Sequence, residues 1–221
     1  MLEQLREEVC RANKSLEKFN LAIFSEGNVS AISEDRKYVV IKPSGASYGK
    51  MVAEDMVVLD LKGNVVEGKL KPSTDAPTHL EIYRKFKKIN SIVHTHSPYA
   101  TIFAQLNEEI PCLGTTHADC FYGNIPVTRD LKEGEVAGEY ELNTGKIICE
   151  TIRENVPAVL VARHGPFVFG ETVQEAVNNS VVLEKVAMMA LHSREAGNIS
   201  KFLLDRHYFR KHGKGRYYGQ S

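Results

Sequence analysis

The sequence predicts a single α/β domain in which a central, mixed or largely antiparallel sheet carries helices on both faces. Segments with helical periodicity alternate with short apolar runs along the whole chain of 221 residues. No linker rich in Pro, Gly or Ser divides the chain, and no internal repeat is visible. Several connections between the predicted strands are short enough to be hairpins, which favours antiparallel pairing.

The first part of the chain predicts one helix followed by short strands. Apolar residues recur at every third or fourth position over residues 2–19, as in an amphipathic helix. Tyr38–Lys42 and Met56–Leu61 predict strands because they are short and rich in β-branched or large apolar residues. Lys62-Gly63-Asn64 predicts a hairpin turn into a further strand at residues 65–67.

The middle of the chain predicts helices on either side of a strand that contains His94. Residues 78–89 have the apolar spacing of a helix. Ser97-Pro98 predicts the start of another helix, because Ser is a good N-cap and Pro is favoured at the first helical position. Residues 133–153 also predict a helix, although Gly138 is unfavourable within it.

The last predicted elements are a buried strand and a long helix. Ala158–Arg163 begins with a continuous apolar run, which is typical of a strand buried on both faces. Thr172 and Glu175 have the spacing of a capping box, and the helix that they begin is expected to reach about Glu195. The basic segment 206–216 is interpreted as a solvated face.

Composition excludes several classes of partner. Lys plus Arg and Asp plus Glu each number 28, so no basic excess favours nucleic-acid binding. No apolar run approaches the roughly 20 residues of a membrane-spanning helix, and residues 1–9 lack the apolar core of a signal peptide. The four cysteines form no C-x-x-C pair. We therefore expect a reduced, cytoplasmic protein with no membrane or nucleic-acid partner.

Three histidines and an aspartate predict a metal site. His94 and His96 are two residues apart, so on a strand they would project from the same face. His164 follows the apolar run that begins at Ala158, and Asp75 lies upstream. A catalytic zinc usually has three protein ligands and one open position. The alternative is that His94 and His96 are a chance pair near the surface.

Three small polar loops predict binding of a phosphorylated or polyhydroxylated substrate. They are Gly27-Asn28, Ser44-Gly45 and Ser73-Thr74. Short side chains let backbone N–H groups approach an anion, and hydroxyl groups add donors. Each loop taken alone could be an ordinary turn. No dinucleotide-binding or Walker-type glycine pattern is present, so nucleotide binding has no support.

Five segments of the chain contain the predicted metal ligands and the three polar loops. They are Gly27-Asn28-Val29-Ser30, Lys42-Pro43-Ser44-Gly45, residues 73–79, His94-Thr95-His96 and His164-Gly165. In this combination they resemble the class II aldolase/adducin-head superfamily. Residues 115–123 and 207–220 resemble its L-ribulose-5-phosphate 4-epimerase branch. Asp75 supports the same branch, because the related sugar-phosphate aldolases have a catalytic Glu at that position. Thr74 in place of Ser and Glu26 in place of Trp are departures from the usual pattern.

The chemistry of such an epimerase follows from its substrate. Carbon 4 of L-ribulose 5-phosphate is not adjacent to the C2 carbonyl, so deprotonation cannot invert it. Cleavage of the C3–C4 bond can, because the C3 electrons delocalise into the carbonyl and a metal acting as a Lewis acid stabilises the anion. Glycolaldehyde phosphate then rotates and adds back through its other face, which gives D-xylulose 5-phosphate.

The resemblance implies roles for individual residues. Asp119 and Tyr218 would be the two acid/base residues, one for each orientation of the C4 oxygen. Zinc would be the cofactor, one ion per subunit, with manganese or cobalt as substitutes. The implied metal ligands are Asp75, His94, His96 and His164. The implied substrate-binding residues are Gly27, Asn28, Lys42, Ser44, Gly45, Ser73, Thr74 and His207.

The resemblance also implies an assembly and leaves two alternatives open. The family forms cyclic tetramers with sites at subunit interfaces, so the one domain over residues 1–221 would use its tail, about 205–221, to complete a neighbouring site. Arabinose catabolism is the implied pathway. The alternatives are a sugar-phosphate aldolase, such as one for fuculose or rhamnulose phosphate, and a non-enzymatic interaction domain like that of adducin. Adducin-like domains lack the metal histidines, which this chain retains.

Overall fold

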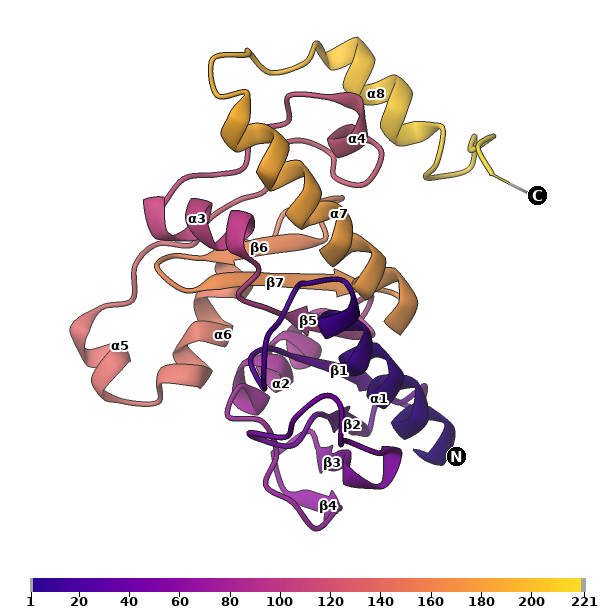
Figure 1. The fold of residues 1–221 in the computed structure, drawn as a ribbon, viewed down its shortest axis with the longest axis vertical. Helices are drawn as coiled ribbons and strands as arrows, with labels where there is room; N and C mark the ends of the chain where they lie inside the picture. The colour runs from indigo at the N-terminus through magenta and orange to yellow at the C-terminus, as the bar shows by residue number, and fades with distance from the viewer. Residues whose placement is uncertain (1, 220–221) are drawn as a thin grey trace.

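A computed structural model describes residues 2–219 and contains one seven-stranded sheet with helices on both faces (Figure 1). The strand order is β4-β3-β2-β1-β5-β7-β6, and every neighbouring pair is antiparallel. The predicted single α/β domain with a largely antiparallel sheet is confirmed, and the mixed alternative does not hold for these seven strands. The strands are β1 (Asn28–Ile32), β2 (Tyr38–Ile41), β3 (Val57–Asp60), β4 (Val65–Glu67), β5 (Ser91–His94), β6 (Ala158–Val161) and β7 (Gly165–Gly170).

The helices are interspersed with these strands along the chain. They are α1 (Leu2–Lys18), η1 (Ala53–Asp55), α2 (Ala76–Lys85), α3 (Pro98–Leu106), α4 (Thr115–Ala118), α5 (Glu133–Ala137), α6 (Tyr140–Thr151), α7 (Val173–His192) and α8 (Lys201–Phe209). No helix within residues 2–219 is both long and apolar enough to cross a membrane. Gln220, the last residue of the tail motif, lies outside the described residues.

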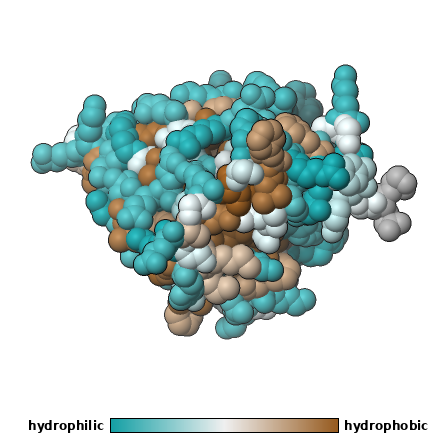
Figure 2. All heavy atoms as spheres, turned by 90° about the horizontal axis from the view of Figure 1, so that it is seen from above, coloured by the Kyte–Doolittle hydropathy of each residue, from teal (hydrophilic) through white to brown (hydrophobic). Residues whose placement is uncertain are grey.

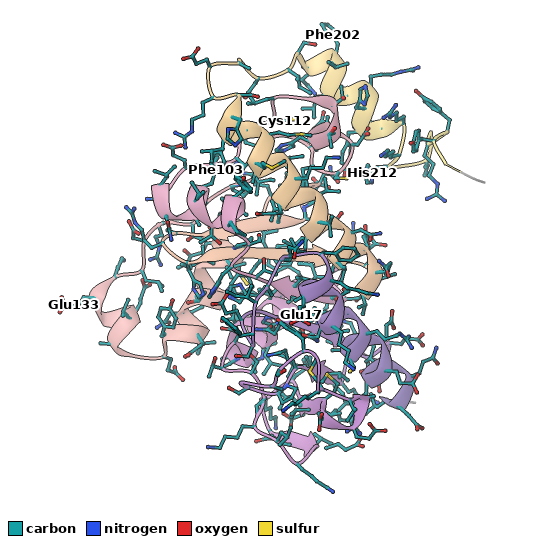
Figure 3. The ribbon with its side chains drawn as sticks, viewed as in Figure 1. Glu17, Phe103, Cys112, Glu133, Phe202 and His212 are labelled. Carbon is teal, nitrogen blue, oxygen red and sulfur yellow. The ribbon has the colours of Figure 1, made fainter. Side chains whose placement is uncertain are left out.

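Two hydrophobic cores lie on opposite faces of the sheet, because side chains alternate along each strand. Val40 and Val93 belong to the core that also contains apolar residues of α1, α3 and α7. Their neighbours Val39 and Ile92 belong to the core under α2 and α6. Figure 3 shows the side chains between these layers, with Phe103 on α3 beside α7. The sheet is therefore buried on both faces.

Most of the predicted elements are confirmed with shifted boundaries. The first helix, the strands of the hairpin, the strand before His164 and the long helix after Thr172 are all present. Thr172 Oγ1 accepts the Glu175 N–H at 3.1 Å, as the capping pattern predicts. The helix predicted at residues 78–89 begins earlier, at Ala76, and ends at Lys85. The helix predicted at 133–153 is instead two helices, which separate at Gly138.

Besides the short helices η1 and α4, the sequence analysis did not predict β1, β7 and α8. β1 begins at Asn28, within the segment interpreted as a turn, and all five of its residues are buried. β7 begins with Gly165-Pro166, a pair that is more typical of loops. α8 overlaps the basic segment 206–216, which the sequence analysis interpreted as a solvated face. Tyr208 within that segment is buried, so the interpretation is wrong for this residue. In each case packing against the rest of the molecule outweighs local propensity.

Candidate metal centre and surrounding site

The three histidines meet at one end of β5 and β7. His94 is the last residue of β5, His96 lies two residues beyond it, and His164 lies in the turn between β6 and β7. One ligand nitrogen from each lies within 4.8 Å of the other two. The expectation that His94 and His96 project from one strand is wrong in detail, because β5 ends before His96.

Each ring is oriented by its surroundings so that a nitrogen can face the centre of the cluster. His94 Nδ1 lies 3.0 Å from Pro166 O, a group that can only accept a hydrogen bond, so Nδ1 carries the proton. The His94 ring also stacks on Phe167 with its centroid 4.2 Å away. The Nε2 atoms of His96 and His164 are 3.0 Å apart. Two imidazole nitrogens at that distance need a proton or a cation between them.

Burial keeps the imidazoles of His94 and His164 in the neutral form that binds metals. Burial lowers the pKa of His164 to about 4, and its neighbours His94 and His96 lower it further while Asp75 opposes the shift. Burial also lowers the pKa of His94. Neutral imidazole is the ligating form. Three imidazole nitrogens within 4.8 Å of one another fit a divalent ion such as zinc with a coordination position left open.

Two glycines let the backbone approach this cluster closely. A Cβ on Gly27 would lie 2.6 Å from His94 O, and its φ of +71° is in the left-handed region. A Cβ on Gly165 would lie 2.7 Å from Thr95 O and 3.2 Å from His96 Cδ2. Gly27 and Gly165 both belong to the segments singled out in the sequence. A side chain at either position would clash with the backbone of the segment that carries His94 and His96.

Asp75 lies beside the histidines but outside the cluster of ligand atoms. It precedes α2, and its Oδ2 accepts a hydrogen bond of 2.6 Å from Asn28 Nδ2. Burial raises its pKa, but His94, His79 and the Asn28 hydrogen bond outweigh burial, so the pKa is lowered overall. The cluster with all ligand atoms within 4.8 Å contains only the three histidines among the described residues. A direct bond from Asp75 to the metal stays a prediction.

Asn28 and Lys42 form a buried polar edge next to Asp75. Asn28 pairs with His94 across β1 and β5, and its Nδ2 also donates to Ser73 Oγ at 3.2 Å. Asn28 Oδ1 is buried and has no partner among the described residues. Lys42 Nζ donates to Ser25 O at 2.9 Å. Burial lowers the pKa of Lys42, and the charge of Asp75 opposes that shift.

The other two polar loops run side by side at the rim of this site. Ser73 N donates to Lys42 O at 2.9 Å, and Ser44 N donates to Lys71 O at 3.0 Å. Ser44, Gly45 and Thr74 are exposed, whereas Ser73 is buried. The structure therefore places these predicted substrate-binding residues near one another at the edge that also holds Asn28.

A cavity of about 440 Å³ opens beside the histidines on the side of α5 and α6. It is lined by His96, Asp130, Leu131, Val136, Tyr140, Ala162, Arg163 and His164. Tyr140 Oη lies 3.1 Å from His164 Nδ1, a contact that the sequence analysis missed. Burial raises the pKa of Tyr140, and Asp75 and Glu141 raise it further, so the phenol is neutral. No local pattern reveals this contact, because the two residues are 24 positions apart.

Asp119 lies in a separate cluster with the tail of the chain. Arg210 Nη2 lies 2.9 and 2.8 Å from its two carboxylate oxygens, Lys211 Nζ lies 3.1 Å from Oδ2, and His207 Nδ1 lies 3.1 Å from Oδ1. Burial raises the pKa of Asp119, but these three partners outweigh it and lower the pKa overall. The Tyr218 ring contacts the same cations, with Arg210 Cζ 4.8 Å and Lys211 Nζ 4.7 Å from its centroid.

The two clusters are not brought together within one chain. α4 and α8, which carry the Asp119 cluster, lie at the top of Figure 1, whereas the turn that carries His164 lies at the left end of β6 and β7. No hydrogen bond or ion pair joins the clusters among residues 2–219. Within the described residues, the predicted acid/base residues Asp119 and Tyr218 therefore lie apart from the histidines.

Comparisons with known proteins show the family and agree with the fold. The family model described as "Class II Aldolase and Adducin N-terminal domain" matches residues 7–191. An L-fuculose 1-phosphate aldolase structure is 25% identical, with 94% of this chain and 95% of that chain covered and a TM-score of 0.81. YgbL of Klebsiella pneumoniae, described as a candidate aldolase, epimerase or decarboxylase, is 29% identical over 93% of this chain and 99% of its own, with a TM-score of 0.76. YgbL of Escherichia coli is 26% identical over 92% and 97%, with a TM-score of 0.75.

Proposed function

Since the chain belongs to the class II aldolase and adducin N-terminal domain family, we propose that it is a metal-dependent epimerase that interconverts L-ribulose 5-phosphate and D-xylulose 5-phosphate. The observation that carries this proposal is the cluster of three histidines with Asp75, rather than a glutamate, held beside it. A phosphorylated ketopentose is the proposed substrate, and arabinose catabolism is the proposed context.

The histidines supply the metal-binding part of the site. His94, His96 and His164 would hold the ion, and Asp75 would be a further ligand or a charged neighbour. When bound, zinc supplies a Lewis acid that withdraws electron density from the substrate oxygens. Asp75 is ionised because its pKa is lowered overall, and Asn28 donates a hydrogen bond to its carboxylate. Its shorter side chain disfavours the base role that glutamate has in related aldolases.

The polar edge at Asn28 and Lys42 supplies the groups that hold the substrate. Asn28 Oδ1 is a buried acceptor without a partner among the described residues, so a substrate hydroxyl group can donate to it. Lys42 Nζ, which the charge of Asp75 influences, adds a hydrogen-bond donor at this edge. The exposed loops at Ser44-Gly45 and Ser73-Thr74 would hold the phosphate, which must stay bound while glycolaldehyde phosphate rotates.

Asp119 and Tyr218 would transfer protons on opposite sides of the C4 oxygen, each supplied by a neighbouring subunit. Their separation from the histidines within one chain supports this assignment. Arg210 and Lys211 keep Asp119 ionised, so it starts as a proton acceptor. His207, which contacts Asp119, would hold that carboxylate and help to bind the substrate.

A cyclic homotetramer would bring the two halves of the site together. α8 has large exposed apolar side chains, among them Phe202, which is 88% exposed. Figure 2 shows apolar side chains gathered near the centre of the face seen from above, where the elements around α4 and α8 lie. A cavity of about 380 Å³ lies there, between α4 and the end of α7. Exposed apolar surface of this kind is typical of subunit contacts.

A sugar-phosphate aldolase is the second candidate, because a solved L-fuculose 1-phosphate aldolase is 25% identical over nearly the whole chain. A third candidate, a non-enzymatic interaction domain, is disfavoured by the intact histidine cluster.

Incubation with L-ribulose 5-phosphate, with and without a chelator, tests the three candidates. The epimerase forms D-xylulose 5-phosphate in a reaction that the chelator abolishes. Accumulation of dihydroxyacetone and glycolaldehyde phosphate without xylulose 5-phosphate would instead identify an aldolase. Absence of both bound metal and metal-dependent turnover would favour the interaction domain.

A further inference from the structure

We propose that Tyr140 is a positioning residue that fixes the tautomer and orientation of His164, so that His164 Nε2 presents its lone pair to the metal ion. The inference rests on the metal site of the proposed function. Tyr140 Oη lies 3.1 Å from His164 Nδ1, and it is the hydrogen-bond partner of that atom among the described residues. Partners of this kind commonly orient metal-binding histidines.

The direction of the hydrogen bond follows from what Nε2 has to do. A neutral imidazole carries one proton, which can be on Nδ1 or on Nε2. His164 Nε2 faces His96 Nε2 at 3.0 Å, so this nitrogen is directed into the cluster. It can bind a cation only if the proton is on Nδ1. Nδ1–H of His164 therefore donates to the hydroxyl oxygen of Tyr140.

The Nδ1 atom of His164 has a side chain as its hydrogen-bond partner, whereas the Nδ1 atom of His94 has a backbone group. The tautomer of His94 is fixed by Pro166 O, a backbone acceptor that cannot donate. His164 lies in the turn between β6 and β7, directly after Arg163, whose φ is +63°. It therefore lacks the strand pairing that holds His94 opposite Phe167. A hydroxyl group that accepts from Nδ1 supplies the missing restraint.

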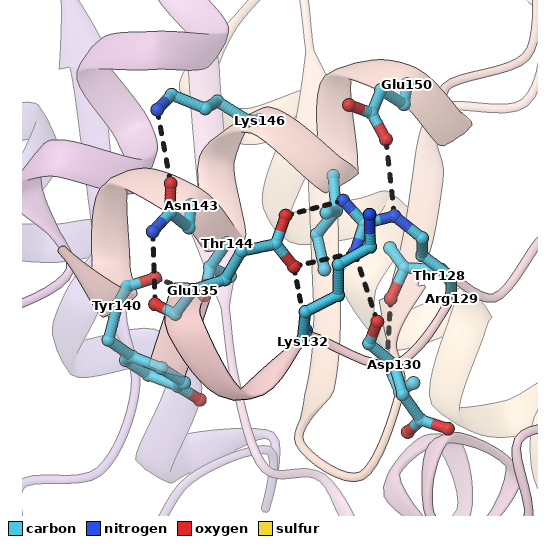
Figure 4. Close-up of polar contacts among 12 residues, drawn as sticks. Thr128, Arg129, Asp130, Lys132, Glu135, Tyr140, Asn143, Thr144, Lys146 and Glu150 are labelled. Atoms are coloured by element: carbon cyan, nitrogen blue, oxygen red, sulfur yellow. Dashed lines mark hydrogen bonds and ion pairs between the residues drawn. The ribbon is translucent and has the colours of Figure 1, made fainter. Parts of the chain in front are cut away.

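Tyr140 is itself held at the start of α6. Thr144 Oγ1 donates to Tyr140 O at 2.8 Å. The corner between α5 and α6 is fastened by Glu135, whose carboxylate accepts two hydrogen bonds of 2.8 Å from Arg129. Asn143 Nδ2 donates to Glu135 O at 3.0 Å, which ties the first turn of α6 to α5 (Figure 4). This network holds the backbone that carries the phenol beside the cluster.

The hydroxyl proton of Tyr140 remains available once the oxygen accepts from His164. Tyr140 and His164 both line the cavity of about 440 Å³ beside the histidines. A hydroxyl group or water molecule in that cavity can therefore accept from Tyr140. One side chain would thus restrain the metal ligand and also contact whatever occupies the cavity.

Zinc affinity of Tyr140→Phe tests the proposal, because this variant keeps the ring and removes only the acceptor. We expect zinc binding to weaken by roughly 10- to 100-fold, the usual effect of losing such a partner, as measured by competition with a chromophoric chelator. Tyr122→Phe is the matched control, since its hydroxyl donates to Asp205, away from the histidines. Zinc affinity in that control should equal that of the wild type.

The tautomer of His164 provides a second readout that needs no metal. Nitrogen chemical shifts of the metal-free wild type should show neutral His164 with its proton on Nδ1, and Tyr140→Phe should lose that preference. A proton on Nε2 in the wild type would refute the proposal. Equal zinc affinity in the wild type and Tyr140→Phe would refute the role of Tyr140 alone, whereas a wild type that binds no zinc would refute the proposed function.

Discussion

Glycine is required at residue 27 for two separate reasons, and these can be separated by experiment. The backbone of Gly27 has a φ of +71°, and a Cβ there would lie 2.6 Å from His94 O. Gly45 has a similar φ of +65° but has no atom within 4 Å of the position that a Cβ would occupy. The strain of a left-handed residue is therefore common to both sites, whereas the clash with the metal-site backbone occurs only at Gly27.

Gly27→Ala should lower the free energy of unfolding more than Gly45→Ala does. The left-handed conformation costs either variant ~1–2 kcal/mol, and displacement of the backbone at His94 adds to this cost in Gly27→Ala alone. Chemical denaturation of the two metal-free variants measures the difference. Equal losses of stability would show that the segment at Gly27 moves away from His94 without cost.

Burial of His117 makes stability depend on pH. Its side chain is 3% exposed, and burial lowers its pKa from 6.5 to about 4, against the opposing hydrogen bond with Gly123 O. Between these values the unfolded chain binds a proton that the folded chain does not. The contribution of neutral His117 to the free energy of unfolding is therefore fully present above pH 6.5 and is lost as the pH falls towards 4.

Replacement of His117 should remove its contribution to the pH dependence of the free energy of unfolding. For the wild type, we expect one buried histidine to contribute a slope of up to ~1.4 kcal/mol per pH unit to the free energy of unfolding. His117→Gln keeps an N–H donor for Gly123 O and has no titrating group. Urea denaturation of both proteins between pH 5 and about 6.5 compares the slopes, and parallel curves would contradict the assignment.

At the scale of elements, the start of α3 depends on a side chain from α7. Ser97 has the predicted N-cap position but makes no side-chain cap hydrogen bond. Glu184 instead accepts from Tyr99 N at 2.9 Å and from Ala100 N at 3.0 Å, one with each carboxylate oxygen. This contact fixes the helix that follows His96, so one long helix supports the segment that carries a predicted metal ligand.

Glu184→Gln should destabilise the protein by ~1–2 kcal/mol, because one amide group of α3 then faces a donor instead of an acceptor. Hydrogen exchange at the amides of Tyr99 and Ala100 should become faster. Thr172→Ala, which removes the cap at the start of α7, is the control for a general loss of stability. Exchange at α3 that changes equally in both variants would argue against a local role for Glu184.

For the whole molecule, the decisive question is whether one active site uses two subunits. Asp119 and the histidine cluster lie on different sides of a single chain. A site shared between neighbours would therefore need an intact histidine cluster from one subunit and an intact Asp119 from the next. Two variants with different defects can test this, because mixing them can recreate a complete site.

His94→Asn and Asp119→Asn should each be inactive alone, the second by at least ~10²-fold because an acid/base group is lost. Mixed oligomers of the two variants should regain roughly a quarter of the wild-type activity, since random assembly in a ring pairs the intact halves at that frequency. Co-expression with two affinity tags yields such oligomers. No recovery of activity would place both groups in one subunit.

Short-range patterns predicted much of the fold and of the metal site because they report local geometry. Periodicity along residues 2–19 specified a helix, and the spacing of Thr172 and Glu175 specified the start of another. Histidine is the commonest metal ligand, and three histidines next to strand-like segments predicted the cluster that the structure contains. The sequence by itself thus determined the class of fold and which histidines belong together.

Only the tertiary structure decided how these parts are arranged. His96 lies beyond the end of β5, β1 is buried although it begins at a polar asparagine, and Tyr140 contacts His164 across 24 positions. The ion cluster that holds Asp119 away from the histidines joins residues 88 to 92 positions apart. Such contacts form only when both faces of the sheet are packed, because the backbone conformation of neighbouring residues does not specify them.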